Sequence, residues 1–371
     1  MRYSYLLLLS LLVLQFSCIQ HNDSQNDSVI ELTIPEVFSV NYAKGFELEK
    51  GNGFIKIITK SFGANTFFRD SIYIVYHDTI QLPNGVKAIN GTVQSLACQS
   101  TTHIAFINQL GKTNLIKGIC GLNYVVNDGV KQILKNNNAF EICLTEKVDT
   151  ESLLGSGAEL FTIYPFGIDV SNDKSYGALK SLFIAEYLEE SQLARLEWVK
   201  LFGLLLGEPE LANAYFQEVE ANYLKLKSNN ISQEKSFIMN VPFNEIWYMP
   251  SPQSVGVQLI EDAGLNYFYA DTEGTENISL PKETVWNDGV SADYWFIIAE
   301  RPQDFTLADL VKEEEVYAEF KSVKEGQVYF CNTVNVDYFA QGTIEPDVIL
   351  KDIQAAAANV QFDSKYFKLL K

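Results

Sequence analysis

The sequence predicts an α/β protein of two Rossmann-like lobes with mainly parallel sheets, joined by one long α-helix and preceded by a β-meander. Three observations support this fold class. The chain has 371 residues, more than a single hydrophobic core usually serves. Residues 191–230 carry the longest helical pattern in the chain. The stretches before and after it repeat a strand–helix–strand order, which is typical of parallel sheets.

The segment 191–230 has apolar residues at helical spacing, with charged residues between them. Gly207 followed by Pro209 predicts a break, because glycine suits the end of a helix and proline the first turn of the next one. We expect a shorter helix ending near Leu206 and a second from about Glu208 to Lys227, roughly 30 Å long at about 1.5 Å per residue. This interlobe helix separates an N-terminal lobe, residues 31–190 with the meander in 31–90, from a C-terminal lobe, residues 231–371.

The first 18 residues predict a secretory signal. They hold one positive charge, an apolar run too short for a stable membrane span, and small residues before Cys18. Because it ends at Ser17 and Cys18, the segment 1–18 resembles a bacterial lipoprotein signal. The resemblance implies a lipidated Cys18 that anchors the protein to a membrane of the cell envelope or periplasm, with simple cleavage as the alternative. Residues 19–30 are polar and predict a flexible tether.

Composition limits the partners. The formal net charge of −19 argues against nucleic acid or an anionic membrane surface. The arginines, Arg2, Arg69, Arg195 and Arg301, are too few to line a pocket with guanidinium groups for a polyanionic ligand, although lysines could substitute in part.

The remaining cysteines, Cys98, Cys120, Cys143 and Cys331, form no CxxC pair and lie in or beside apolar strand-like runs. This pattern argues against zinc ligation. Buried thiols are the expected state, and one disulfide among the first three is the alternative in an oxidising compartment.

Both halves of the chain read as alternating strands and helices. The antiparallel meander should contain the strands 54–62 and 71–78. The first lobe should contain strands at 93–98, 114–120 and 158–167 and helices at 103–111 and from Asp149. The second should contain strands at 236–243, 245–250, 292–300 and 327–332 and helices at 254–264, from 279 and at 346–360. In parallel sheets ligands bind at the carboxyl ends of strands, which points to residues 100–103, 120–124 and 164–167.

Three stretches resemble the substrate-binding proteins of ABC importers for iron-siderophores and cobalamin, the class whose lobes are joined by a single helix. They are residues 95–121, 184–216, and 246–268 together with 281–297, and the resemblance covers about residues 90–371. It implies a monomeric extracytoplasmic receptor without a cofactor, which binds a metal chelate between its lobes and delivers it to a permease dimer with its ATPase. It also implies that Glu151 and Glu283, at equivalent helix starts, dock onto permease arginines, although a first-turn Glu is favoured by the helix dipole alone.

Aromatic and polar residues at predicted strand ends are the candidate ligand contacts. We expect the ligand to meet Ser100, Thr101, His103, Tyr124, Tyr164, Trp247 and Tyr248. His103 could instead bond to neighbouring backbone. Low basicity disfavours strongly anionic catecholate complexes and leaves neutral hydroxamate complexes or corrinoids.

An enzyme is not expected. The histidines are His21, His77 and His103, and the chain has no GxSxG, HExxH or P-loop motif. The alternative function is a surface lipoprotein that binds glycan or protein through an exposed aromatic platform.

Overall fold

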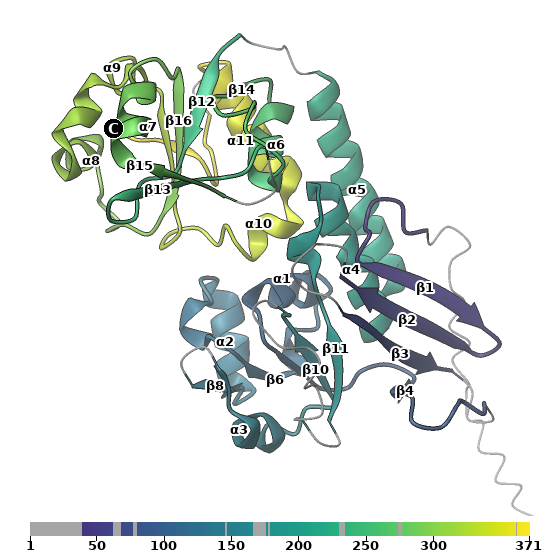
Figure 1. The fold of residues 1–371 in the computed structure, drawn as a ribbon. Helices are drawn as coiled ribbons and strands as arrows, with labels where there is room; N and C mark the ends of the chain where they lie inside the picture. Colours follow the sequence, from purple (N-terminus) through teal and green to yellow (C-terminus); the bar gives the residue numbers. More distant parts are fainter. Residues whose placement is uncertain are drawn as a thin grey trace, which may run out of the picture. The chain divides into compact units, whose positions relative to one another are not determined.

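The computed structural model describes residues 39–61, 68–76, 80–144, 147–165, 176, 179–229, 234–273, 277–360 and 362–371 (Figure 1). The signal sequence with Cys18, the tether with His21, and also His77 and Phe166 lie outside the described residues.

The β-meander is a four-stranded sheet in the order β1-β2-β3-β4. Its strands are β1 Phe46–Gly51, β2 Phe54–Lys60, β3 Arg69–Val75 and β4 Ala88–Asn90. The first three strands pair antiparallel, as the sequence predicts. The last strand, β4, pairs with β3 in parallel, so the sheet is not the purely antiparallel one expected.

The first lobe contains a parallel sheet in the order β11-β10-β5-β6-β7. Its strands are β5 Leu96–Cys98, β6 Ile116–Ile119, β7 Phe140–Glu141, β10 Leu160–Ile163 and β11 Lys180–Phe183. Its helices are α1 Thr101–Gln109, α2 Asp128–Asn136 and α3 Thr150–Gly155. Three short 3₁₀ turns are η1 Thr113–Leu115, η2 Leu122–Tyr124 and η4 Glu186–Leu188. A hairpin pairs β8 Cys143–Leu144 with β9 Lys147–Val148. Side chains of Ser100, Asn127 and Asp149 cap the three helices, which fixes where each begins.

The second lobe contains a sheet in the order β14-β12-β16-β17-β18, parallel except for β18. Its strands are β12 Ser236–Met239, β14 Asn266–Tyr267, β16 Tyr294–Ala299, β17 Val328–Asn332 and β18 Lys368–Leu369, and a separate antiparallel pair joins β13 Ile246–Met249 to β15 Ile278–Pro281. Its helices are α6 Val255–Asp262, α7 Lys282–Gly289, α8 Leu307–Glu313, α9 Lys321–Lys324, α10 Gln341–Ile344 and α11 Pro346–Ala357, with a 3₁₀ turn η5 at Glu315–Glu319. The predicted α/β fold class is therefore confirmed.

Two helices fill the segment between the lobes: α4 Gln192–Leu206 and α5 Pro209–Ser228 (Figure 1). Gly207 ends α4 in the left-handed conformation, with φ 75°. A Cβ added there would lie 2.7 Å from Thr92 Cγ2, so the position favours glycine on both counts. The break predicted at Gly207 and Pro209 is thus confirmed, and α5 also packs against α11 of the second lobe.

Two buried carboxylates of the segment leading into and through α4 hold the chain just before the meander. Glu197 accepts backbone N–H bonds from Asn41, Tyr42 and Ala43 at 2.7–3.1 Å. Glu189 accepts those of Lys44 and Gly45 at 2.9–3.1 Å. The segment that leads into the meander is therefore bound to the linking segment by backbone hydrogen bonds to two buried carboxyl groups.

Within the described part of the chain, none of the helices combines the length and apolar character of a membrane span.

Candidate ligand-binding cleft

A hollow of about 760 Å³ lies between the carboxyl ends of strands from both lobes. Its volume falls within the usual range for small-molecule sites, about 300–1,000 Å³. It is lined by Thr101, Asn123, Tyr124, Val125, Val126, Asp128, Lys131, Glu300, Gln303, Thr333, Val334, Asn335, Val336, Asp337, Tyr338 and Phe339. We refer to this hollow as the cleft.

The first-lobe wall of the cleft follows from the ends of β5 and β6. After β5, Ser100 caps α1 by accepting from Thr102 N at 3.2 Å, which brings Thr101 to the start of the helix and into the cleft. After β6, the turn η2 carries Tyr124, whose side chain is 79% exposed. An exposed aromatic ring on a cleft wall offers an apolar face to a ligand.

The second-lobe wall follows from the ends of β16 and β17 in the same way. Glu300 and Gln303 come directly after β16, and residues 333–339 come directly after β17. Phe339 is 62% exposed, so a second aromatic face lies in the lining. Both walls obey the rule that ligands of parallel sheets bind beyond the carboxyl ends of the strands.

The charged side chains that line the cleft are mostly acidic. Asp128, Glu300 and Asp337 contribute carboxylates, and Lys131 lies 3.4 Å from Asp128. Desolvation in its partly buried setting raises the pKa of Asp337, although a backbone N–H bond from Ala340 opposes the shift. This charge balance suits a neutral or cationic ligand better than a polyanion.

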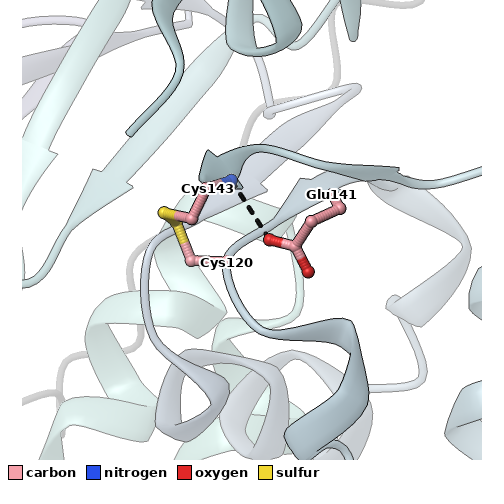
Figure 2. Close-up of side chains that lie close together, drawn as sticks. All are labelled: Cys120, Glu141 and Cys143. Carbon is pink, nitrogen blue, oxygen red and sulfur yellow. Dashed lines mark hydrogen bonds between the residues drawn. A yellow bond between two sulfur atoms is a disulfide. The ribbon is translucent and has the colours of Figure 1, made fainter. Parts of the chain in front are cut away.

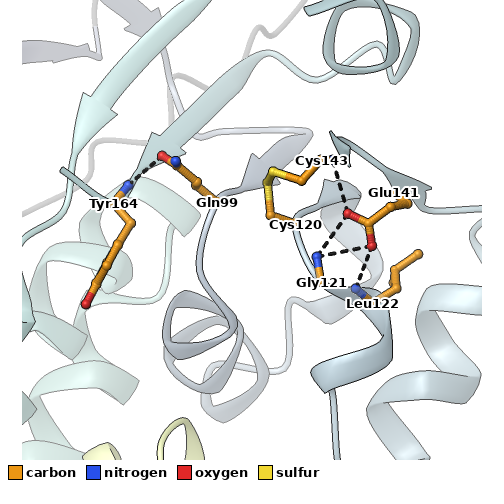
Figure 3. Close-up of a disulfide and its surroundings, with 7 residues drawn as sticks. All are labelled: Gln99, Cys120, Gly121, Leu122, Glu141, Cys143 and Tyr164. Atoms are coloured by element: carbon orange, nitrogen blue, oxygen red, sulfur yellow. Dashed lines mark hydrogen bonds between the residues drawn. A yellow bond between two sulfur atoms is a disulfide. The ribbon is translucent and has the colours of Figure 1, made fainter. Parts of the chain in front are cut away.

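The predicted contacts Thr101 and Tyr124 line the cleft, while Ser100 acts as a helix cap. Tyr164 is half-buried, with its ring centre 4.3 Å from that of Tyr187. Its backbone N–H donates to Gln99 Oε1 at 3.0 Å (Figure 3). Tyr164 is not among the described residues of the lining.

The structure corrects the expectation for His103. Its side chain is fully buried, and Nδ1 lies 2.9 Å from Thr162 Oγ1 on β10. Neither a ligand contact nor a bond to neighbouring backbone describes this arrangement. Burial on the inner face of α1 explains it, because the helix begins at Thr101 and turns position 103 toward the sheet.

The structure also corrects the expectation for Trp247. This side chain is fully buried beside Trp295 and Tyr317, and its Nε1 donates to Met239 O at 2.9 Å. Its neighbour Tyr248 is 45% exposed on the opposite face of β13, outside the described lining of the cleft. Alternation along the strand buries one aromatic residue and exposes the next.

Sequence reasoning missed the second-lobe wall. The signal was available, because the strand-end rule applied to residues 292–300 and 327–332 would have pointed to Glu300 and to the run from Thr333 to Phe339.

A disulfide joins Cys120, after β6, to Cys143, after β7, whereas Cys98 and Cys331 are buried free thiols. Figure 2 shows the Glu141 carboxylate beside this bond, accepting from Cys143 N. The ligand atoms of these three side chains lie within 4.8 Å of one another. Because both sulfurs are shared in the disulfide, the oxidised cluster does not offer thiolates to a metal.

Residues 182–334 match the family model of the periplasmic binding proteins. An uncharacterized lipoprotein of Methanocaldococcus jannaschii is 27% identical over 288 residues, which span 74% of this chain and 67% of the relative. A second lipoprotein of the same organism is 26% identical over 195 residues, 48% of this chain and 46% of the relative.

Solved structures share the fold. A siderophore-binding protein bound to ferric iron and acinetobactin has a TM-score of 0.58 at 14% identity, covering 72% of this chain and 94% of its own. The vitamin B12-binding protein of Vibrio cholerae has a TM-score of 0.54 at 12% identity, covering 72% and 97%. A periplasmic heme-binding protein of Pseudomonas aeruginosa has a TM-score of 0.56 at 13% identity, covering 75% and 98%. The matched family and these structures are binding proteins, not enzymes.

Proposed function

Because this chain has the fold of the periplasmic binding proteins and matches their family model, we propose that it is the solute receptor of an ABC importer. It captures a metal chelate of the iron(III)-siderophore or cobalamin type in the cleft and delivers the chelate to a membrane permease with its ATPase. The observation that carries the proposal is the cleft itself, which both lobes line at their strand ends.

The lining indicates the class of chelate. Tyr124 and Phe339 offer apolar aromatic faces, and the neighbouring charges are mainly carboxylates. A neutral ferric hydroxamate or a corrinoid fits such a lining better than an anionic catecholate complex, whose charge these carboxylates would repel.

Anchoring through a lipidated Cys18 would keep the receptor at the membrane that holds its permease. Two similar proteins are lipoproteins by name, which supports the anchor. Mass spectrometry of the mature N-terminus tests it: we expect a diacylated or triacylated cysteine, and an unmodified N-terminus would contradict the anchor.

Ligand-dependent melting tests the function. A ferric trihydroxamate, cyanocobalamin, haem and oligosaccharides are added separately to the purified protein. Binding to the folded state alone adds about 2.7 kcal/mol of stability when the ligand is at 100 times its dissociation constant. We expect this for one class of chelate, whereas a response to oligosaccharide alone would favour the alternative, a glycan-binding surface lipoprotein.

Two variants of the lining and one matched control locate the binding site. Tyr124→Ala and Phe339→Ala each remove an exposed aromatic ring from the lining, and Phe243→Ala removes one that is 71% exposed outside it. The first two should weaken binding by about 1–3 kcal/mol, as loss of an aromatic anchor does. Equal affinities in all three variants would place the ligand elsewhere.

A further inference from the structure

We propose that the Cys120–Cys143 disulfide and the Glu141 carboxylate together form a clamp that positions Tyr124 in the cleft. The consequence for ligand affinity rests on the proposed function, whereas the positioning itself does not. The oxidation state of the disulfide then controls how well Tyr124 is held.

The first tie of the clamp is covalent. Strand β6 ends at Ile119, and the next residue, Cys120, is bonded to Cys143 at the start of β8. The bond connects the loop that leads to Tyr124 with the chain that leaves β7, closing a sequence separation of 23 residues.

The second tie is a charged carboxylate with three backbone donors. Glu141 accepts from Gly121 N at 2.9 and 3.1 Å, from Leu122 N at 2.8 Å and from Cys143 N at 3.1 Å (Figure 3). The same side chain therefore holds both ends that the disulfide joins. Hydrogen bonds to an ionised acceptor are roughly twice as strong as neutral ones.

These ties matter because β7, the strand next to the loop of residues 120–124, has only a short pairing with the rest of the sheet. Strand β7 lies at the end of the sheet order and pairs with β6 through only Gly118–Phe140 and Ile119–Glu141. Beyond the pairing, Ile142 N donates to Ile119 O at 2.9 Å, and Cys120 N donates to Cys98 O of β5 at 3.0 Å; neither bond reaches residues 121–124. The ladder between β6 and β7 therefore ends before the loop of residues 121–124 begins.

Tyr124 takes its position from this loop. Its backbone N–H donates to Gly121 O at 2.9 Å, and a Cβ added at Gly121 would lie 2.7 Å from Tyr124 Cδ2. The ring thus lies against the bare backbone of Gly121, which has φ 82°. Because Tyr124 is otherwise exposed, the position of its ring depends on the backbone that the clamp holds.

Chymotrypsin cleavage after Tyr124, without any ligand, tests the clamp directly. Cleavage needs local opening of the loop, so its rate reports how firmly the loop is held. We expect cleavage to be roughly tenfold faster in Glu141→Gln, since a hydrogen bond to a charged group is worth about that factor or more. We expect a similar acceleration in the Cys120→Ser/Cys143→Ser double variant, because it loses the covalent tie. Glu210→Gln, an exposed glutamate in the first turn of α5, serves as the control and should cleave like the wild type.

Urea unfolding of the same variants separates the clamp from general stability. Faster cleavage with an unchanged unfolding midpoint supports local positioning. Wild-type cleavage rates in both clamp variants would overturn the proposal. Acceleration only in proportion to lost global stability would overturn it too.

Binding of a ferric trihydroxamate supplies the second readout. Dithiothreitol reduces the disulfide to two thiols and is oxidised to its cyclic disulfide. We expect about tenfold weaker binding after this reduction, recovery on reoxidation, and no further loss when the Tyr124→Ala variant is reduced. Full additivity of the two changes would contradict positioning through Tyr124. If neither the trihydroxamate nor the other chelates bind, the proposed function fails while the cleavage rates still decide on the clamp.

Discussion

Glu186 and His103 form a fully buried polar pair beneath the first turn of α1. Thr102 Oγ1 donates to Glu186 Oε1 at 2.5 Å, and Glu186 Oε2 lies 3.8 Å from His103 Nε2. Burial raises the pKa of Glu186 above its ordinary value of 4.5 and lowers the pKa of His103 to about 3. Burial therefore favours the protonated carboxyl group of Glu186 and the neutral imidazole of His103, directly behind the first-lobe wall of the cleft.

We predict that this pair shapes the pH dependence of stability. Above pH 4.5 the folded chain keeps a proton on Glu186 that the unfolded chain releases, so the free energy of unfolding should fall as pH rises through the folded pKa. Glu186→Gln removes that fall, and its stability relative to the wild type should increase with pH. His103 acts in the opposite sense, since its depressed pKa costs stability as pH drops below 6.5. Urea unfolding of both proteins between about pH 4.5 and 8 measures the difference; parallel curves would contradict the assignment to Glu186.

Trp247 and Tyr248 should respond oppositely to truncation. Trp247→Ala removes a fully buried ring and should lower the free energy of unfolding by about 3–5 kcal/mol. Tyr248→Ala, at a half-exposed position, should change it by less than about 1 kcal/mol. Chemical denaturation compares the two, and a small effect at Trp247 would contradict its place in the core.

Residue identity alone could not separate Trp247 from Phe339. Both are aromatic residues near strand ends in the sequence, and which one faces a ligand depends on strand register and on the path of the chain after β17. The pairing of Cys120 with Cys143 was likewise one of several combinations, because two cysteines pair only when β6 and β7 become neighbours.

At the scale of single elements, α4 combines an apolar surface with a buried ion pair. Lys200 Nζ lies 2.8 Å from Glu197 Oε1, and Glu197 also holds the N–H groups of residues 41–43. Loss of one partner from such a buried pair typically costs about 3–5 kcal/mol.

We therefore predict that Glu197→Ala destabilises the protein by about that amount and releases residues 41–43 to hydrogen exchange. Glu190→Ala is the control, since its side chain is 64% exposed, and should have little effect. Unchanged exchange at residues 41–43 in the Glu197 variant would show that other contacts hold this segment.

Glu151 and Glu283 stand in the first turns of α3 and α7, and both are exposed. If they dock onto the permease, changing both to Gln should leave ligand affinity and melting temperature nearly unchanged while uptake falls, because rim charges steer and register a complex. Uptake by cells that carry the double variant measures this. Normal uptake would leave both residues as helix-end charges favoured by the dipole.

Helices and strands with strong periodicity were predictable from the sequence. The interlobe break at Gly207 and the strands β16 and β17 match expectation because their local signals agree with the tertiary environment. Helix α2 was not predicted, since its buried apolar residues are only Val130 and Leu134. Strand β18 exists through its pairing with β17, which no local pattern encodes.

At the scale of the whole molecule, the two helices between the lobes should limit the conformational change on ligand binding. Nearly all of α4 is buried, and α5 packs against both α4 and α11. We predict a small rocking motion instead of a large hinge closure. X-ray scattering of the protein with and without the chelate that stabilises it should give a nearly constant radius of gyration. A marked decrease on binding would contradict the stiff link.

The hydrogen bonds that Glu189 and Glu197 accept from residues 41–45 also affect the order in which the chain folds during synthesis. The donors precede their acceptors by 144 to 156 residues, so they leave the ribosome long before the carboxylates that hold them. Contacts of such high sequence separation form late in folding, because a long loop must close first. Nascent chains that stop short of α4 should therefore carry an unfinished meander, exposed to proteases and chaperones until the linking helix follows.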